Sequence, residues 1–184
     1  MRANTHIVGG VALATATTAF TGLYQPHSIP EAVALGTFFI IPAIIGSLAP
    51  DIDHGNSKAS NVNIFTKILS VFLRIVCGHR GVIHSPLFMC ILGVLLYGLL
   101  VWLGVGNALE IAEGFTIGYF SHLLIDMTNA SGIPLFFPFS WESAGVPKKY
   151  NLLGLREGGI AEFIMWTVLV GLSGMFLYMI WTRM

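Results

Sequence analysis

The chain has 184 residues, of which 55% are hydrophobic and only 10% are charged. Soluble domains carry about 25% charged residues, so this composition excludes an ordinary soluble protein and indicates a multi-pass membrane protein. The formal net charge is zero, so no basic surplus points to nucleic acid. The two cysteines, Cys77 and Cys90, form no CxxC motif, which argues against a zinc ribbon or a redox pair.

Five largely apolar stretches are each long enough to cross a membrane as a helix. They are residues 5–24, 31–49, 86–105, 108–127 and 160–181. The sequence therefore predicts an all-α fold, a multi-pass transmembrane helical bundle of about five spans, as a single integral-membrane domain over residues 1–184. Arg2 followed by an apolar run also resembles a signal peptide, whose cleavage would remove the first span together with His6.

Several shorter features refine the predicted bundle. Pro42 is expected to kink the second span, which membrane helices tolerate. Residues 61–76 are amphipathic and predict a helix lying in the membrane interface, with a connector packed on the bundle as the alternative. Ser85 is a good helix cap and Pro86 a good first helical residue, so the third span is expected to begin there.

The loop over residues 128–159 contains the segment GIPLFFPFSW. This segment is too rich in proline for a regular helix and too apolar for free solvent. We therefore expect a re-entrant or interfacial segment anchored by its aromatic side chains.

Lysine and arginine residues are distributed unequally between the two sides of a five-span chain. The side of the N-terminus carries eight of them: Arg2, Lys58, Lys67, Arg74, Arg80, Lys148, Lys149 and Arg156. The opposite side carries only Arg183. The positive-inside rule therefore predicts a cytoplasmic N-terminus and a C-terminus on the opposite side of the membrane.

Histidine and aspartate residues gather on the same predicted side, at four span ends. They are His6, Asp51, Asp53, His54, His79, His84, His122 and Asp126. Carboxylates near the C-terminal ends of helices are disfavoured by the helix dipole, so a bound cation would explain Asp51 and Asp126. The alternative is a hydrogen-bonded polar cluster without metal. His27 falls on the opposite side and is expected to take no part.

The fourth span carries a stripe of four residues spaced by four: Gly114, Gly118, His122 and Asp126. Residues at this spacing stack on one face of a helix. The glycines allow a neighbouring backbone to come close. His122 and Asp126, one turn apart, can hold one metal ion from a single helix face.

The motifs THIVGG, LAPDIDH, GHRGVIHSPL and GYFSHLLIDMTNASGIPLFFPFSW resemble the YdjM-type family of bacterial inner-membrane proteins, described as membrane-bound metal-dependent hydrolases. The resemblance implies a multi-pass fold in the bacterial inner (plasma) membrane. It also implies a metal centre at His6, Asp51, Asp53, His79, His84, His122 and Asp126. The chain departs from the family pattern at Ile83, where threonine is frequent, and at Asn129-Ala130-Ser131, where Thr-Pro is usual.

Imidazole and carboxylate ligands without thiolate suit Zn²⁺, Mn²⁺ or Fe²⁺, and a histidine-rich set favours zinc. Seven candidates exceed the four ligands that one zinc usually takes, so one or two ions are expected. Arg80 is suited to hold a phosphate bidentately, with Lys148 and Lys149 as further cations, and Asp53 is the candidate for proton transfer.

The sequence thus predicts a membrane-bound metal-dependent hydrolase that acts on a phosphoester or lipid headgroup at the cytoplasmic face. Its partners would be the lipid bilayer and a phosphate-bearing lipid substrate. Two alternatives stay open. One is a non-catalytic membrane protein with a structural metal site, which would need a closed coordination shell. The other is a metal or proton transporter, whose site would be expected near the bilayer midplane rather than at one face.

Overall fold

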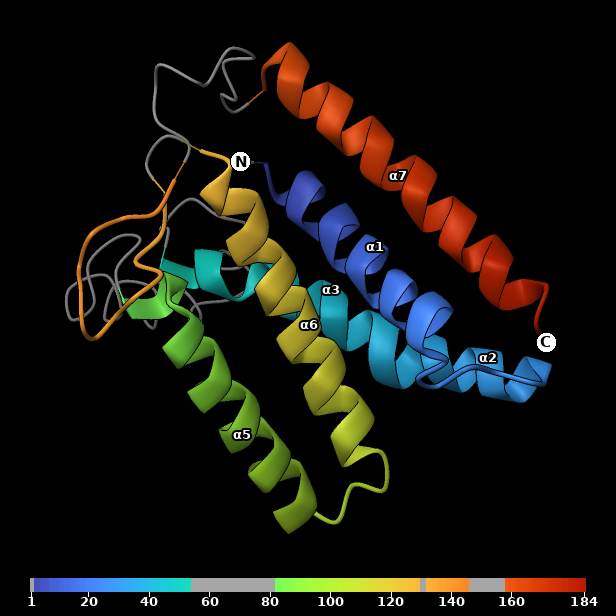
Figure 1. Ribbon diagram of the computed structural model, residues 1–184. Helices are drawn as coiled ribbons and strands as arrows, with labels where there is room; N and C mark the ends of the chain where they lie inside the picture. Colours follow the sequence, from blue (N-terminus) through green and yellow to red (C-terminus); the bar gives the residue numbers. More distant parts are fainter. Residues whose placement is uncertain (1, 54–81, 130–131, 146–157) are drawn as a thin grey trace.

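The computed structural model describes residues 2–53, 82–129, 132–145 and 158–184, which form a bundle of helices (Figure 1). Its elements are α1 (Ala3–Thr21), α2 (Ile29–Leu35), η1 (Gly36–Ile40), α3 (Ile41–Leu48), η2 (Pro50–Asp53), η3 (Val82–His84), α5 (Pro86–Trp102), α6 (Ala108–Met127) and α7 (Ile160–Trp181). Within these residues the one β-type pairing is an isolated bridge between Ile133 and Ala144. The all-α prediction is therefore confirmed for the described part of the chain.

Local sequence signals account for the ends of α5. The side chain of Ser85 accepts a hydrogen bond from the Phe88 N–H at 3.2 Å, and Pro86 follows as the first helical residue. The helix ends at Trp102, short of the expected residue 105, because Gly104 adopts a left-handed backbone with φ of 72°.

The second predicted span is a continuous rod made of α2, η1 and α3 (Figure 1). Its middle section, η1, is a π-helical turn in which the Ile41 N–H donates to the carbonyl of Gly36, five residues earlier. Pro42 follows at once, and it has no N–H to donate. The disturbance expected at Pro42 thus takes the form of a wider helical turn just before it.

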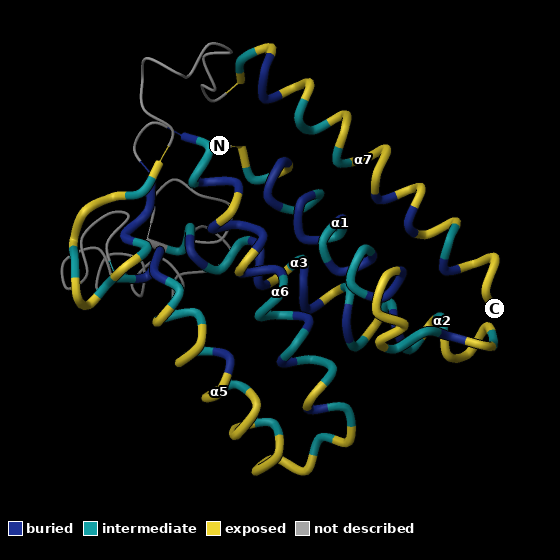
Figure 2. Tube along the Cα trace, in the orientation of Figure 1, coloured by how far each residue is buried: buried dark blue, intermediate teal, exposed yellow. Residues whose placement is uncertain are grey.

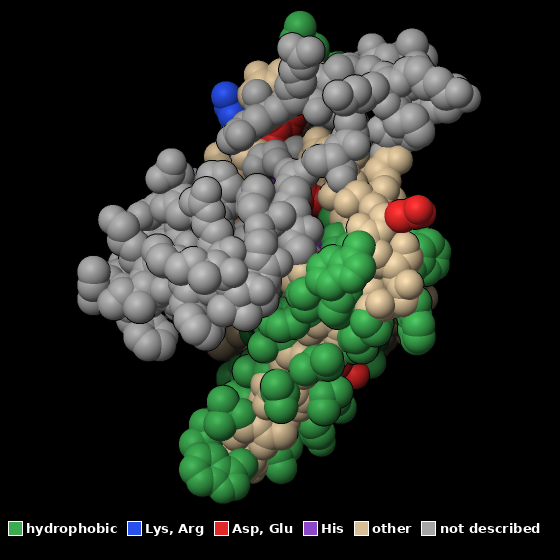
Figure 3. All heavy atoms as spheres, turned by 90° about the vertical axis from the view of Figure 1, so that its left-hand side faces the viewer, with side chains coloured by type: hydrophobic (Ala, Val, Ile, Leu, Met, Phe, Trp, Pro, Cys, Tyr) green, Lys and Arg blue, Asp and Glu red, His purple; other side chains and the backbone are tan. Residues whose placement is uncertain are grey.

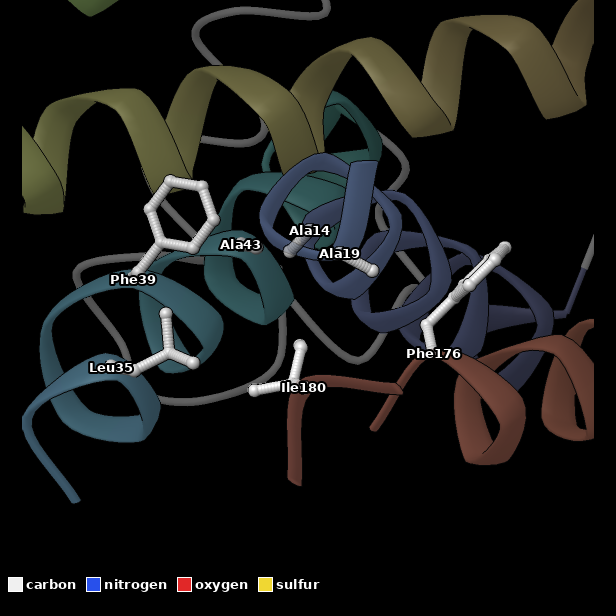
Figure 4. Close-up of a cluster of buried hydrophobic side chains, with 7 residues drawn as sticks. All are labelled: Ala14, Ala19, Leu35, Phe39, Ala43, Phe176 and Ile180. Carbon is white, nitrogen blue, oxygen red and sulfur yellow. The ribbon is translucent and has the colours of Figure 1, made fainter. Parts of the chain in front are cut away.

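The centre of the bundle is α1, which packs against α3, α6 and α7, while α5 packs on the outside of α6. Figure 4 shows side chains from α1, the α2–α3 rod and α7 meeting in one hydrophobic cluster. Its members are Ala14, Ala19, Leu35, Phe39, Ala43, Phe176 and Ile180. In Figure 2, α5 and α7 expose much of their length, whereas α1 and α6 are mostly buried or half-buried.

The backbones of α3 and α6 are in direct contact. A Cβ added to Gly46 would lie 2.0 Å from the carbonyl oxygen of Phe115, and one added to Gly114 would lie 2.3 Å from that of Phe39. Only glycine allows so close an approach, so the predicted role of the glycine stripe is confirmed at Gly114. This contact places the C-terminal ends of α3 and α6 side by side.

Two helical segments of the described chain are both long and apolar enough to cross a membrane: Ile29–Leu48 and Ile160–Trp181. α5 is apolar but shorter. Exposed hydrophobic side chains cover the outer surface of α5. Figure 3 shows hydrophobic side chains over the lower part of the molecule. α1 and α6 are interior helices. α1 is rich in threonine and glycine, and α6 contains the acidic residues Glu110, Glu113 and Asp126, which lowers the hydropathy of both helices. The five-span arrangement stays a prediction, and the amphipathic segment 61–76 lies outside the described residues.

Candidate metal centre

Four helical elements end at one place and bring histidine and aspartate side chains together. His6 comes from the first turn of α1, Asp51 from η2, His84 from the end of η3, and His122 and Asp126 from the last turns of α6. The carboxylate of Asp126 lies at the centre of this cluster. Its oxygens are 3.7 Å from the Nε2 atoms of His6, His84 and His122.

The histidine rings themselves are in contact. The rings of His6 and His122 stack with centroids 3.8 Å apart and an interplanar angle of 16°. Nε2 of His122 also lies 3.8 Å from a carboxylate oxygen of Asp51. Two groups of ligand atoms result, His6–His122–Asp126 and Asp51–His84–His122, and within each group all the atoms lie within 4.8 Å of one another.

These distances distinguish between a metal site and a hydrogen-bonded network. A hydrogen bond from a ring nitrogen to an oxygen measures about 2.7–3.2 Å, and the separations at Asp126 are longer. Ligands held about 2.0–2.2 Å from a zinc ion at tetrahedral angles are about 3.3–3.6 Å apart. The observed separations of 3.7 Å are therefore closer to those of ligands around a common ion.

Because the rings of His6 and His122 are buried, their nitrogens need a polar or metal partner within the protein. His6 and His122 are completely buried, and Asp126 is 1% exposed. Within the described residues, both ring nitrogens of His6 and Nε2 of His122 have no hydrogen-bond partner. A buried polar group without a partner costs about 1–3 kcal/mol. A metal ion bound to the Nε2 atoms of His6 and His122 would remove that cost for these two nitrogens, so the donor set fits a metal.

A hydrogen bond outside the cluster fixes the orientation of His122. Its Nδ1 lies 2.7 Å from the backbone carbonyl of Ser47, at the end of α3. A carbonyl only accepts hydrogen bonds, so Nδ1 must carry the proton and Nε2 presents its lone pair to the cluster. Asn129 donates to the Oδ1 atom of Asp126 at 3.3 Å and so orients the central carboxylate.

The turn that carries His84 is held from α6. The hydroxyl of Tyr119 donates a hydrogen bond to the carbonyl of Ile83. The side chain of Ile83 is 2% exposed and packs with Tyr119, Leu123 and Ile133. The isoleucine at this position, where the related family often has threonine, therefore fills an apolar contact beside the cluster.

Glu162, at the start of α7, is a residue that the sequence reasoning missed. It is 2% exposed, and its carboxylate accepts hydrogen bonds from the Arg2 N–H at 2.6 Å, the Gly158 N–H at 2.6 Å and the Thr5 hydroxyl at 2.9 Å. Glu162 thus fastens the start of α1, and with it His6, to α7. The available signal was an acidic residue inside an apolar span, which marks a functional or structural site.

The other predicted site residues are not part of the described cluster. Asp53 is the last residue of η2, but its side chain, like His79 and Arg80, lies outside what the structure describes. Lys148 and Lys149 also lie outside it. His27 is exposed next to the N-terminal end of α2, at the opposite end of the rod from Asp51.

The family model described as YdjM inner membrane protein matches residues 1–184. The chain belongs to this family. Membership confirms the resemblance drawn from the motifs, and the family name identifies an inner membrane protein.

Two relatives illustrate the range of similarity. The chain is 34% identical over 138 residues to the Bacillus subtilis (strain 168) protein YvsG. This aligned region covers 75% of the chain and 74% of YvsG. The chain is 36% identical over 118 residues to the inner membrane protein YdjM of Escherichia coli (strain K12). This aligned region covers 62% of the chain and 58% of YdjM. No solved structure matches the chain.

Proposed function

We propose that the protein is a membrane-bound metal-dependent hydrolase that cleaves a phosphoester or related headgroup bond of a lipid at the cytoplasmic face. The observation that carries this proposal is the convergence of three buried Nε2 atoms on the carboxylate of Asp126, each at 3.7 Å. Mixed imidazole and carboxylate donors are the ligands of hydrolytic zinc, manganese and iron sites.

The residues that would hold the metal are His6, Asp51, His84, His122 and Asp126. Their two overlapping groups are compatible with one or two ions. When bound, the metal supplies a Lewis acid that polarises the bond to be cleaved and activates water. Zinc is favoured because histidines are the majority of the donors.

Among the described residues of the cluster, Asp51 is the one that is partly exposed. The side chain of Asp51 is 23% exposed, whereas the histidine side chains and Asp126 are almost completely buried. Water and substrate would therefore reach the cluster from the side of η2. Asp53 ends the same turn, and we assign it proton transfer. We assign Arg80 to the phosphate group of the substrate, because its planar guanidinium matches two phosphate oxygens.

The location of the cluster favours a hydrolase over a transporter. Its donors come from the ends of helical elements at one end of the bundle, while transporter sites typically lie near the bilayer midplane. The segment 132–145 carries exposed Phe136, Phe139 and Trp141, and it begins five residues after the end of α6. Aromatic side chains of this kind settle at the membrane interface, which supports a site at headgroup depth.

The test is the release of phosphate or headgroup from a panel of membrane phospholipids by metal-loaded protein in detergent. We expect turnover that is lost in His122→Ala and Asp53→Asn and reduced in Arg80→Lys, since an ammonium cannot reproduce the planar fork. His27→Ala, at the opposite end, should retain wild-type turnover. Absence of activity across the panel, with metal bound, would overturn the proposal and favour a structural metal.

A further inference from the structure

The loop over residues 132–145 has a buried base and an exposed tip. Its first three residues, 132–134, are buried, whereas most residues of 136–143 are exposed. Ile133 and Ala144 close the base through two backbone hydrogen bonds, of 3.0 Å and 2.8 Å, which form an isolated bridge. Within the described residues, the two ends of the loop therefore meet at one bridge, and the arrangement of its base depends on few contacts.

Asn129 connects the base of this loop to the central carboxylate of the metal cluster. Its backbone carbonyl accepts a hydrogen bond from the Gly132 N–H at 3.1 Å, and its side-chain amide donates to Oδ1 of Asp126 at 3.3 Å. Gly145, at the other end of the loop, packs on the same carbonyl, because a Cβ added there would lie 2.6 Å from it. A shift of the base would therefore move Asn129 and the amide that orients Asp126.

The base of the loop also supports a second candidate ligand, His84. The side chain of Ile133 is completely buried and packs in one cluster with Ile83 and Tyr119. The Tyr119 hydroxyl donates to the carbonyl of Ile83, which directly precedes His84. The loop thus contacts the supports of two groups of the cluster that lie 3.7 Å apart, Nε2 of His84 and Oδ2 of Asp126.

The tip of the loop carries three exposed aromatic side chains. Phe136 is 63% exposed, Phe139 is 96% exposed and Trp141 is 66% exposed. The loop lies beside the start of α5, whose exposed side chains are apolar along the whole helix (Figure 1). Aromatic rings at the edge of such an apolar surface are typical of the membrane–water interface. The partner that fits this tip is the headgroup region of the bilayer.

We propose that the tip of the loop binds the headgroup region of the bilayer, and that this contact stabilises the position of Asn129 and of Asp126, so that the membrane raises the metal affinity of the centre. The proposal rests on the proposed function and concerns the regulation of that same site. Coupling between two binding events is reciprocal. Metal binding should therefore also strengthen the contact between the tip and the bilayer.

The first experiment measures zinc affinity in nanodiscs of phosphatidylethanolamine and phosphatidylglycerol that hold one copy of the protein each. Replacing both Phe139 and Trp141 with serine should weaken zinc binding several-fold, because the tip then loses its contact with the bilayer. Trp102→Ser is the control, since Trp102 is 78% exposed at the far end of α5, and it should leave the affinity unchanged. Equal zinc affinity of the tip variant and the wild type would overturn the proposal. An effect that appears only with two copies in each disc would mean that the tip binds a second copy, and would also overturn it.

The second experiment tests whether the coupling runs through Asn129. Asn129→Leu keeps the shape of the side chain but removes the donor to Asp126, so zinc affinity should fall about 10- to 100-fold. The visible spectrum of bound Co²⁺, which reports the geometry of the ligands, should change as well. Asn107→Leu is the matched control at the other end of α6, where the asparagine side chain makes no capping hydrogen bond. An unchanged affinity and cobalt spectrum in Asn129→Leu would contradict the proposal.

A double-mutant cycle separates this route from a general loss of stability. The tip variant should weaken zinc binding in the wild-type background and have no further effect in the Asn129→Leu background. Gly145→Ala, which disturbs the base of the loop, should behave in the same way. Thermal unfolding and gel filtration verify that each variant is folded, and the tip positions are exposed, so their substitution leaves the core intact. Fully additive losses would show that Asn129 does not carry the coupling.

The two proposals fail in different ways. Zinc affinity and cobalt spectra need no turnover, so a response to the tip variant without hydrolysis of any lipid leaves the coupling in place and removes the hydrolase. If lipid is hydrolysed and the tip variant binds zinc as tightly as the wild type, the hydrolase stands and the coupling falls.

Discussion

A Cβ added at Gly118 would lie 1.8 Å from the carbonyl oxygen of Ala43, so α3 and α6 touch backbone to backbone one turn before His122. The same contact brings the carbonyl of Ser47 to Nδ1 of His122. The close approach of two helices therefore also sets the orientation of a candidate metal ligand.

Gly118→Ala is expected to force α3 away from α6, because the added methyl group would meet backbone atoms that cannot rotate aside. Overpacking of this kind costs about 1–3 kcal/mol, and the shift should also lower metal occupancy. Thermal unfolding in detergent and metal analysis measure the two effects. The matched control is Gly98→Ala on α5, where an added Cβ has nothing within 4 Å. If both variants behave alike, the close contact does not determine the stability of the bundle.

The purified protein is expected to contain about one or two divalent ions, as the overlapping ligand groups allow. Asp51→Ala, His84→Ala and His122→Ala should each lower the metal content measured by mass spectrometry, because each removes a donor. His27→Ala should leave it unchanged. Wild-type metal content in all three cluster variants would mean that the cluster is a hydrogen-bonded network that binds no metal.

Glu162→Gln is expected to destabilise the protein by about 1–3 kcal/mol, because an amide N–H would then face one of three hydrogen-bond donors. The start of α1 should loosen, so metal affinity should also fall through His6. Chemical denaturation and metal titration test these effects, and Glu142→Gln, at an exposed position, serves as the control. Equal stability of the two variants would show that Glu162 does not fasten α1 to α7.

The predicted topology places the N-terminus and the metal centre in the cytoplasm and the C-terminus across the membrane. A reporter that is active only outside the cytoplasm should therefore be active when fused after Met184, and one that is active only inside should be silent. The opposite pattern would mean that the number of spans is even or that the first is removed as a signal peptide. The distribution of lysine and arginine is the physical reason for the expectation.

Local signals made much of the fold predictable. The bounds of α6 and α7 agree with the expected spans 108–127 and 160–181, and the cap at Ser85 fixed the start of α5. The π-helical turn Gly36–Ile40 was not foreseen, because a wider turn depends on how the rod packs and leaves no periodic pattern of its own.

The candidate site was predictable in its members but not in its geometry. Residue type and position at span ends pointed to His6, Asp51, His84, His122 and Asp126 together. That three rings converge on Asp126 depends on the register between helices far apart in sequence, which composition and spacing do not encode. Glu162 was not predicted for the same reason, since two of its three hydrogen-bond donors, Arg2 and Thr5, lie at the other end of the chain.

The order in which the cluster is completed has a consequence for how the protein matures. His6 precedes Asp126 by 120 residues, so His6 is translated well before Asp126. Between α1, which carries His6, and α6, which carries Asp126, the structure describes α2, η1, α3, η2, η3 and α5. A chain that has not yet reached Asp126 lacks the central carboxylate, so a metal bound by the cluster would stabilise a bundle that is already assembled and would not direct its assembly.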